Sequence, residues 1–196
     1  MGRRRAQLDA MSRRIAEAAF ELHATVGPAQ TSISAVAERA GVQRHTVYHH
    51  FPDLRSLMRA CTEHGMRVTR TPEAAPWRAI EDPTERLRRG LGELYDYYSA
   101  NARLLGNIIR DMPLLGDSAG AEAFIDRMGE LFAALADGWP GDAASQRIRM
   151  VTIGHAMSYD SWRSLIDKGL SDAEATELMI RFVTTVAETP ARTGET

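Results

Sequence analysis

The sequence predicts an all-α protein, and two observations carry this prediction. Apolar residues recur three and four positions apart over most of the 196 residues, which is the period of an amphipathic helix. No segment of useful length alternates apolar and polar residues, as a half-buried strand does. Glycine and proline fall between the periodic stretches and mark where helices end.

Four helices are expected in the first 70 residues. The first carries an apolar stripe over 11–26 and stops at Gly27-Pro28. The second covers about 31–40, with Thr31 or Ser32 as its N-cap, and ends at Gly41. The third runs from about Gln43 to Phe51. Pro52-Asp53 opens the fourth, in which four apolar side chains share one face: Leu54, Leu57, Met58 and Cys61.

The rest of the chain is also expected to be helical. Three prolines between 72 and 83 mark a linker. Helical patterns follow over about 87–109 and 124–135, separated by a break from Met112-Pro113 to Gly116. One long helix is expected from about Ala143 to Lys168, and a last one carries a nearly unbroken apolar stripe over 175–186. We therefore divide the chain into two predicted domains, 1–70 and 71–196.

Charge is distributed unevenly between these two domains. The whole chain has a net charge of −2, which by itself is unlike a nucleic-acid-binding protein. Residues 1–70, however, hold 11 arginines against 6 acidic residues, whereas the other 126 residues hold 13 basic and 20 acidic residues. A net charge of +5 in the first part and −7 in the second is typical of a small basic nucleic-acid-binding domain attached to an acidic second domain. Random scatter of charge is the alternative.

The predicted third helix has an unusual surface. Val47 and Phe51 are four residues apart and can face a core together. The rest of the helix is crowded with donors, aromatic rings and imidazoles: Arg44, His45, Thr46, Tyr48, His49 and His50. A solvated helix has no physical need for such a density of these groups, whereas a helix that lies in a DNA groove does. The pattern predicts a helix-turn-helix.

The segment from about Ile15 to Leu57 resembles the DNA-binding domain of the tetracycline-repressor (TetR) family of transcriptional regulators. The matching positions are Thr31-Ser32-Ile33, Val36-Ala37, Ala40-Gly41-Val42, Thr46, Tyr48, His50-Phe51 and Leu57. The stretch from His155 to Thr176 also resembles the paired C-terminal helices through which such regulators dimerise. The resemblance implies an N-terminal three-helix helix-turn-helix domain joined to a larger helical ligand-binding and dimerisation domain.

The resemblance also implies DNA-contacting roles for individual residues. The third helix would enter the major groove, where Arg44 can donate two hydrogen bonds to guanine. Gln43 could read adenine or contact a phosphate, and His45 and Thr46 could reach base edges. Tyr48 and His50 match positions that bind phosphates, which set register. The complete candidate set is Ser32, Ser34, Gln43, Arg44, His45, Thr46, Tyr48, His49, His50 and Arg55.

One position departs from the family pattern. The family often has a basic residue three positions after the residue matching Phe51, where it contacts a phosphate. This chain has Leu54 there, followed by Arg55. Either Arg55 makes the contact instead, or Leu54 turns inward onto the apolar face of its helix and the contact is lost. We favour an inward Leu54.

The resemblance implies that the second domain encloses a small-molecule pocket and forms a homodimer through the last two helices. Such a dimer would read a near-palindromic double-stranded operator, and ligand binding would release a repressor from it. Polar or aromatic residues within apolar helices are the candidates for the pocket, although each also has a structural interpretation: Tyr98, Asn107, Arg110, His155, Tyr159 and Trp162. The effector itself is not identified by the sequence.

Other functions are less well supported by the sequence. No nucleophile-elbow context and no HExxH motif is present, so an all-α enzyme is not expected, and a scaffold would not explain the polar third helix. A ligand-independent regulator and an activator stay open. His49 and His50 point about 100° apart on a helix, and no carboxylate or cysteine stands at ligand spacing, so we expect no metal site there. No cofactor is expected either. The single cysteine, Cys61, is expected as a buried thiol and not as a redox sensor, and without an apolar membrane-length run or signal peptide we expect a cytoplasmic location.

Overall fold

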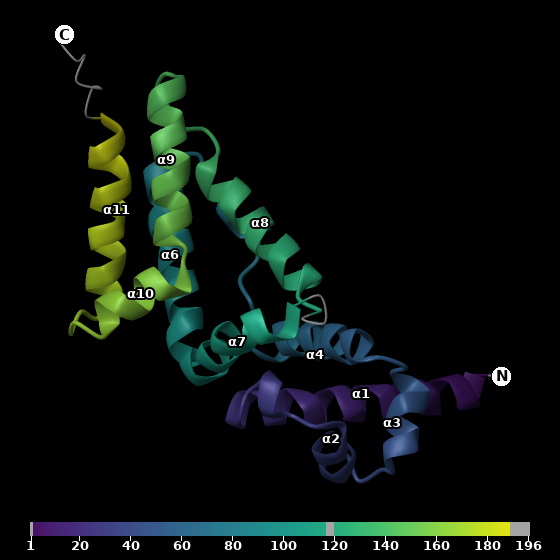
Figure 1. The fold of residues 1–196 in the computed structure, drawn as a ribbon. Helices are drawn as coiled ribbons and strands as arrows, with labels where there is room; N and C mark the ends of the chain where they lie inside the picture. The colour runs from purple at the N-terminus through teal and green to yellow at the C-terminus, as the bar shows by residue number, and fades with distance from the viewer. Residues whose placement is uncertain (1, 117–119, 189–196) are drawn as a thin grey trace. The chain divides into compact units, whose positions relative to one another are not determined.

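The computed structural model describes residues 2–116 and 120–188 (Figure 1). The regular elements of this part of the chain are eleven α-helices and one short 3₁₀ helix, so the all-α prediction is confirmed. In chain order they are α1 Gly2–Thr25, η1 Pro28–Gln30, α2 Ile33–Arg39, α3 Arg44–His50, α4 Leu54–Val68, α5 Ala74–Arg78, α6 Pro83–Ala100, α7 Ala102–Leu115, α8 Glu122–Ala136, α9 Ala143–Ala156, α10 Tyr159–Ile166 and α11 Asp172–Glu188. None of the described helices has the length and apolar character needed to cross a membrane.

The helices form two compact units. One comprises Met1–Thr71 together with Asn101–Asp126, and the other comprises Pro72–Ala100 together with Arg127–Thr196. The chain therefore leaves the first unit after Thr71, returns to it for α7 and the start of α8, and leaves it again within α8. The functional division into 1–70 and 71–196 stays a prediction, because compactness is defined by contacts and not by function.

The core of the first unit lies where α1, α2, α3 and α4 meet. Its buried side chains are Ile15, Ala18, Ala19, Val36, Ala37, Ala40, Val47, Phe51, Leu57 and Cys61. Ser32 caps α2 by accepting a hydrogen bond from the Ala35 amide at 3.1 Å, and Asp53 caps α4 in the same way from Ser56 at 2.7 Å. These side-chain caps satisfy amides that have no partner within their helices, and so fix where both helices begin.

The turn between α2 and α3 is built on Gly41, whose φ of 62° lies in the left-handed region. The Gly41 amide donates to the Glu38 carbonyl at 3.0 Å, and the Val42 amide donates to the Ala37 carbonyl at 2.9 Å. This pair of bonds is a Schellman motif, which closes the C-terminus of a helix. The motif turns the chain sharply and sets the start of α3 directly after α2.

Helix α7 packs against the end of α1 through polar contacts. The side-chain amide of Asn107 donates from Nδ2 to the backbone carbonyl of His23 at 3.2 Å. The buried Asp111 carboxylate accepts from the Ala29 amide at 3.0 Å and from Arg110 Nε at 2.7 Å. Gly27 approaches this carboxylate so closely that a Cβ there would lie 2.4 Å from Asp111 Oδ2, with φ at +95°. Helix α7 is therefore tied to the end of α1 and to η1 by hydrogen bonds as well as by packing.

The second unit has an apolar core around α6. Its largest fully buried side chains include Trp77, Leu87, Leu91, Leu94, Tyr95, Leu131, Leu135, Ile153 and Trp162. Two buried arginines hold the connection between α8 and α9: Arg86 donates to the Asp137 carbonyl at 2.9 Å, and Arg149 donates to the Pro140 carbonyl at 2.6 Å. Each guanidinium group thus gives a carbonyl of this connecting segment a hydrogen-bond donor.

Three predicted boundaries are wrong. The region predicted as a linker contains α5, whose Trp77 is fully buried and donates to Glu93 at 2.7 Å. The break predicted at Met112-Pro113 comes later, because α7 continues through Pro113 to Leu115. A proline in the sequence indicates a break but gives no information about tertiary packing. Packing stabilises both α5 and the last turn of α7, despite the prolines within them.

The third wrong boundary is the single long helix predicted over 143–168. The structure has two helices there, with α9 ending at Ala156 and α10 beginning at Tyr159. Two buried tyrosines of α6 account for the break. The Tyr95 hydroxyl donates to the Ala156 carbonyl at 2.7 Å, and the Tyr98 hydroxyl donates to the Met157 carbonyl at 2.5 Å. These bonds satisfy carbonyls that a continuous helix would have paired internally.

Candidate nucleic-acid interface

Helix α3 is held by two apolar side chains on one side. Val47 is fully buried and Phe51 is 8% exposed, both within the core shared with α1, α2 and α4. Gln43 precedes the helix with extended backbone, φ −86° and ψ 152°, and its carbonyl accepts the first hydrogen bonds of the helix from the amides of Thr46 and Val47. The prediction that Val47 and Phe51 face the core is confirmed.

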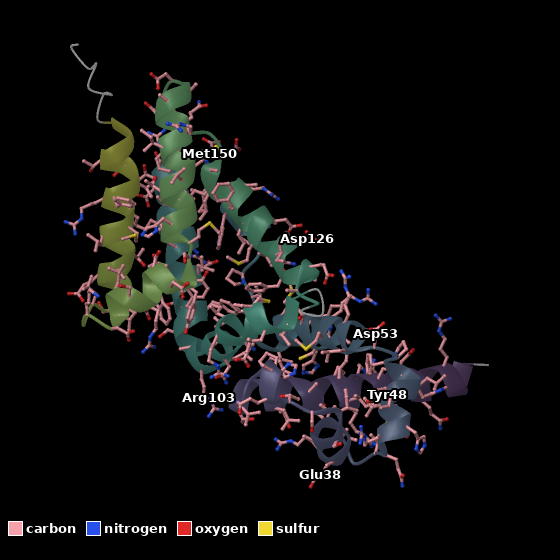
Figure 2. The ribbon with its side chains drawn as sticks, viewed as in Figure 1. Glu38, Tyr48, Asp53, Arg103, Asp126 and Met150 are labelled. Carbon is pink, nitrogen blue, oxygen red and sulfur yellow. The ribbon has the colours of Figure 1, made fainter. Side chains whose placement is uncertain are left out.

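The other side of α3 is exposed, as the polar pattern predicts. Tyr48 is 48% exposed and is labelled on α3 in Figure 2. Gln43, Arg44, His45 and His49 are also exposed, and Thr46 is half-buried. Ser32 and Ser34 at the start of α2 are exposed too. The structure therefore brings most of the candidate DNA-binding residues to the outer surface of the first unit, on two helices joined by the Gly41 turn.

His50 differs from its neighbours because it is half-buried and has a defined partner. Its Nδ1 lies 2.9 Å from Ser12 Oγ of α1. Burial, and to a lesser extent the neighbouring His49, holds the pKa of His50 below its ordinary value of 6.5, so the ring is neutral at physiological pH. When the Ser12 hydroxyl donates to Nδ1, the single ring proton lies on Nε2, where it can be donated outward.

Leu54 and Arg55 do not follow the favoured interpretation. Leu54 is 43% exposed, so the prediction that it turns inward is wrong. Leu54 is the first residue of α4, directly after the Asp53 cap, and the buried positions of this helix begin one turn later at Leu57. Arg55 is exposed, and its Nε donates to Glu122 Oε1 at 3.0 Å, with a second contact from Nη2 to the same oxygen.

Ser12 and Glu122 were missed by sequence reasoning. Ser12 lies 38 residues before His50, and Glu122 lies 67 residues after Arg55. Neither stands at a spacing that brings residues together on one helix. The chain offers no local signal for either contact, because both depend on how α1 and the start of α8 pack in the first unit.

The alternative chemistries receive no support from the described residues. No group of three or more His, Cys, Asp or Glu side chains in that part of the chain is arranged to hold a metal ion. Cys61 is buried, with Sγ 3.1 Å from His23 Nδ1. Burial raises the pKa of the Cys61 thiol to about 12. Because the reactive form of cysteine is the thiolate, this position is unsuited to redox sensing.

The six candidate pocket residues fall in both compact units. Tyr98, Tyr159 and Trp162 form a cluster of rings whose centroids are 5.2–5.6 Å apart. His155, also in the second unit, contacts the ring of Phe182. Asn107 and Arg110 belong to the first unit, where they bind the end of α1. The polar atoms of several candidates already have protein partners; for example, Trp162 Nε1 donates to Asp172 at 2.7 Å.

The chain is similar to known proteins in sequence over its N-terminal part and in fold over most of its length. Residues 15–61 match the family model described as bacterial regulatory proteins, tetR family. No similar sequence is found among curated proteins. Among solved structures, a tetR-family transcriptional regulator from Streptomyces coelicolor is 22% identical, with a TM-score of 0.62 over 91% of this chain and 82% of that chain.

Two further solved structures are similar. A mutant of HlyIIR is 15% identical, with a TM-score of 0.61 over 89% of this chain and 97% of that chain. RolR in complex with resorcinol is 19% identical, with a TM-score of 0.50 over 94% of this chain and 96% of that chain. At such identities these likenesses show the fold.

The N-terminal unit presents a polar helix after a Schellman turn, which is the geometry of a helix-turn-helix DNA-binding domain, and the family match falls on the same residues. Residues 15–61 match the tetR family in sequence, and the chain as a whole is similar in fold to solved structures of such regulators.

Proposed function

We propose that this regulator is a homodimeric repressor that reads a near-palindromic operator with α3 and releases it when a small molecule binds. The observation that carries the proposal is the exposed polar face of α3, anchored from behind by Val47 and Phe51. A helix held in this way can enter the major groove as a rigid body. The role proposed for each of its residues follows from the chemistry and the exposure of the side chain.

The residues at the N-terminal end of α3 are proposed to read the sequence. Arg44 is exposed there and can donate two hydrogen bonds to guanine. Gln43, His45 and Thr46 are proposed to reach neighbouring base edges or phosphates. The next set is proposed to bind phosphates and thereby fix register: Ser32, Ser34, Tyr48, His49, His50 and Arg55.

The test is a fluorescence anisotropy titration of the full chain against DNA from upstream of its own gene, at several salt concentrations. Arg44→Ala should weaken specific binding by about fivefold to a hundredfold, the value of one bidentate base contact. The matched control is Arg67→Ala, which removes an exposed arginine from the last turn of α4, away from the proposed interface. Equal losses in the two variants would contradict the groove assignment of α3.

The dimer is proposed to form through the C-terminal helices. Met150 and Val151 of α9 are 50% and 68% exposed, and Leu178 of α11 is 36% exposed. Exposed apolar groups on packed helices support burial against a second copy. Light scattering should then give about twice the chain mass of 21.7 kDa. A monomer at micromolar concentration would contradict this part of the proposal.

The small-molecule effector is proposed to bind in the second domain, and RolR supports this because its solved complex contains resorcinol. The candidates for the pocket stay Tyr98, Asn107, Arg110, His155, Tyr159 and Trp162. A melting-temperature screen against metabolites and drugs would find a ligand, since one that binds only the folded chain raises its stability. A hit that also lowers operator affinity supports a ligand-released repressor. A hit that raises operator affinity, or a screen without hits, favours a ligand-activated or ligand-independent regulator. A cytoplasmic location is proposed with this function.

A further inference from the structure

Arg55 at the start of α4 is paired with a carboxylate in the DNA-free chain. Its Nε donates to Glu122 Oε1 at 3.0 Å, and Nη2 contacts the same oxygen. The hydrogen bond from Arg55 also holds the pKa of Glu122 below its ordinary range, so the carboxylate is ionised at physiological pH. A positive charge proposed to meet a DNA phosphate is therefore already neutralised locally.

The backbone places Glu122 at this position. Gly120 has φ +58°, and a Cβ there would lie 2.5 Å from the Arg59 backbone nitrogen and 2.9 Å from Met58 Cβ. Ala121 follows and is 8% exposed. The approach of Gly120 to the α4 backbone and the burial of Ala121 dock this segment on α4, so Glu122 is held beside Arg55 by more than the ion pair itself.

A DNA phosphate and the Glu122 carboxylate would bind the same group, the guanidinium of Arg55. Both accept charge-assisted hydrogen bonds from the guanidinium group. A phosphate that binds Arg55 must displace Glu122 or share the guanidinium with it, and the carboxylate also repels the phosphate. We propose that Glu122 lowers operator affinity by competing with a DNA phosphate for Arg55. This inference rests on the proposed function, since it needs α3 and the start of α4 to face DNA.

The experiment is an anisotropy titration of the full chain and its Glu122→Gln variant against the same operator over a range of salt. Glu122→Gln should tighten binding by about twofold to tenfold at about 50 mM salt, because an exposed ion pair is weak and its loss frees only one contact. The plot of log affinity against log salt should steepen by about one unit, because Arg55 can neutralise one more phosphate when the Glu122 charge no longer competes for it.

The matched control is Asp126→Asn. Asp126 is exposed one turn further along α8, so this variant removes the same charge without removing the partner of Arg55. It should change affinity and salt slope less than Glu122→Gln. The second control is the Arg55→Ala background, in which Glu122→Gln should do no more than Asp126→Asn, because the contested cation is gone.

Three outcomes would overturn the inference. They are equal effects of Glu122→Gln and Asp126→Asn, an undiminished effect of Glu122→Gln in the Arg55→Ala background, and no loss of affinity when Arg55→Ala is added to Glu122→Gln. In each case a loss of binding in Arg44→Ala would leave the proposed function standing. Absence of operator binding by the unmodified chain would overturn the proposed function and this inference together.

Discussion

Acidification from about pH 7 to about pH 5 should destabilise the first unit mainly through its most deeply buried imidazole, that of His23. This side chain is 4% exposed, and its Nδ1 lies 3.1 Å from the Cys61 sulfur. Burial lowers the pKa of His23 from 6.5 to about 4, and the carboxylate of Asp111 opposes this shift only in part. The folded chain therefore holds this ring neutral at pH values where the unfolded chain protonates it.

The sign and size of the effect follow from linkage. Because the folded pKa is lowered, the stabilising contribution is complete above about pH 6.5 and is lost as the pH falls toward about 4. A gap of roughly two and a half pKa units corresponds to about 3 kcal/mol in the free energy of unfolding. About 2 kcal/mol of this should already be lost at about pH 5, where most of the carboxylates are still ionised.

Urea denaturation at the two pH values measures this loss. The decrease in the free energy of unfolding should be larger by about 2 kcal/mol in the unmodified chain than in His23→Gln, whatever the absolute stability of the variant. His45→Gln is the matched control, because it removes an exposed imidazole from α3. Equal pH dependence in the unmodified chain and His23→Gln would refute the reasoning, as would an NMR titration of the His23 ring with a pKa near 6.5.

Two further substitutions test single hydrogen bonds. Ser12→Ala removes the partner of His50 Nδ1. It should weaken operator binding about twofold to fivefold and change the His50 ring from the Nε2–H tautomer to a mixture of tautomers. Unchanged ring nitrogen chemical shifts and unchanged operator affinity would show that Ser12 does not position the ring. Tyr95→Phe leaves the Ala156 carbonyl without its buried donor; it should lower the free energy of unfolding by about 1–2 kcal/mol, and an unaltered urea midpoint would remove this hydroxyl as the cause of the break after α9.

Much of the helix-turn-helix could be predicted because its signals are local. Ser32 caps α2, Gly41 takes a left-handed conformation after it, and Val47 and Phe51 face one core from successive turns of α3. Caps, glycine turns and three- or four-residue periods act within a few residues of chain. Local physics of this kind can be read from the order of amino acids without knowledge of the path of the chain.

The errors have the opposite origin. Leu54 belongs to an apolar pattern with Leu57 and Met58, yet it is exposed because helix α4 begins with it and the core does not extend that far. The helix predicted over 143–168 is divided by hydroxyls of α6 tyrosines, about 60 residues earlier in the chain. The apolar pattern of one helix predicts which of its faces is buried. It does not predict how far the core extends along that face, or which hydrogen-bond donors other helices bring to it.

The sequence by itself determined that this protein is helical, that its positive charge lies in the first 70 residues, and that a polar helix over Gln43–Phe51 reads as a helix-turn-helix. Only the tertiary structure decided which partners these groups have: His50 meets Ser12 of α1, and Arg55 meets Glu122 of α8. The physical reason is range. Backbone conformation and amphipathic faces are set by neighbours within a turn or two, whereas a side-chain partner 38 or 67 residues away depends on where packing carries both segments.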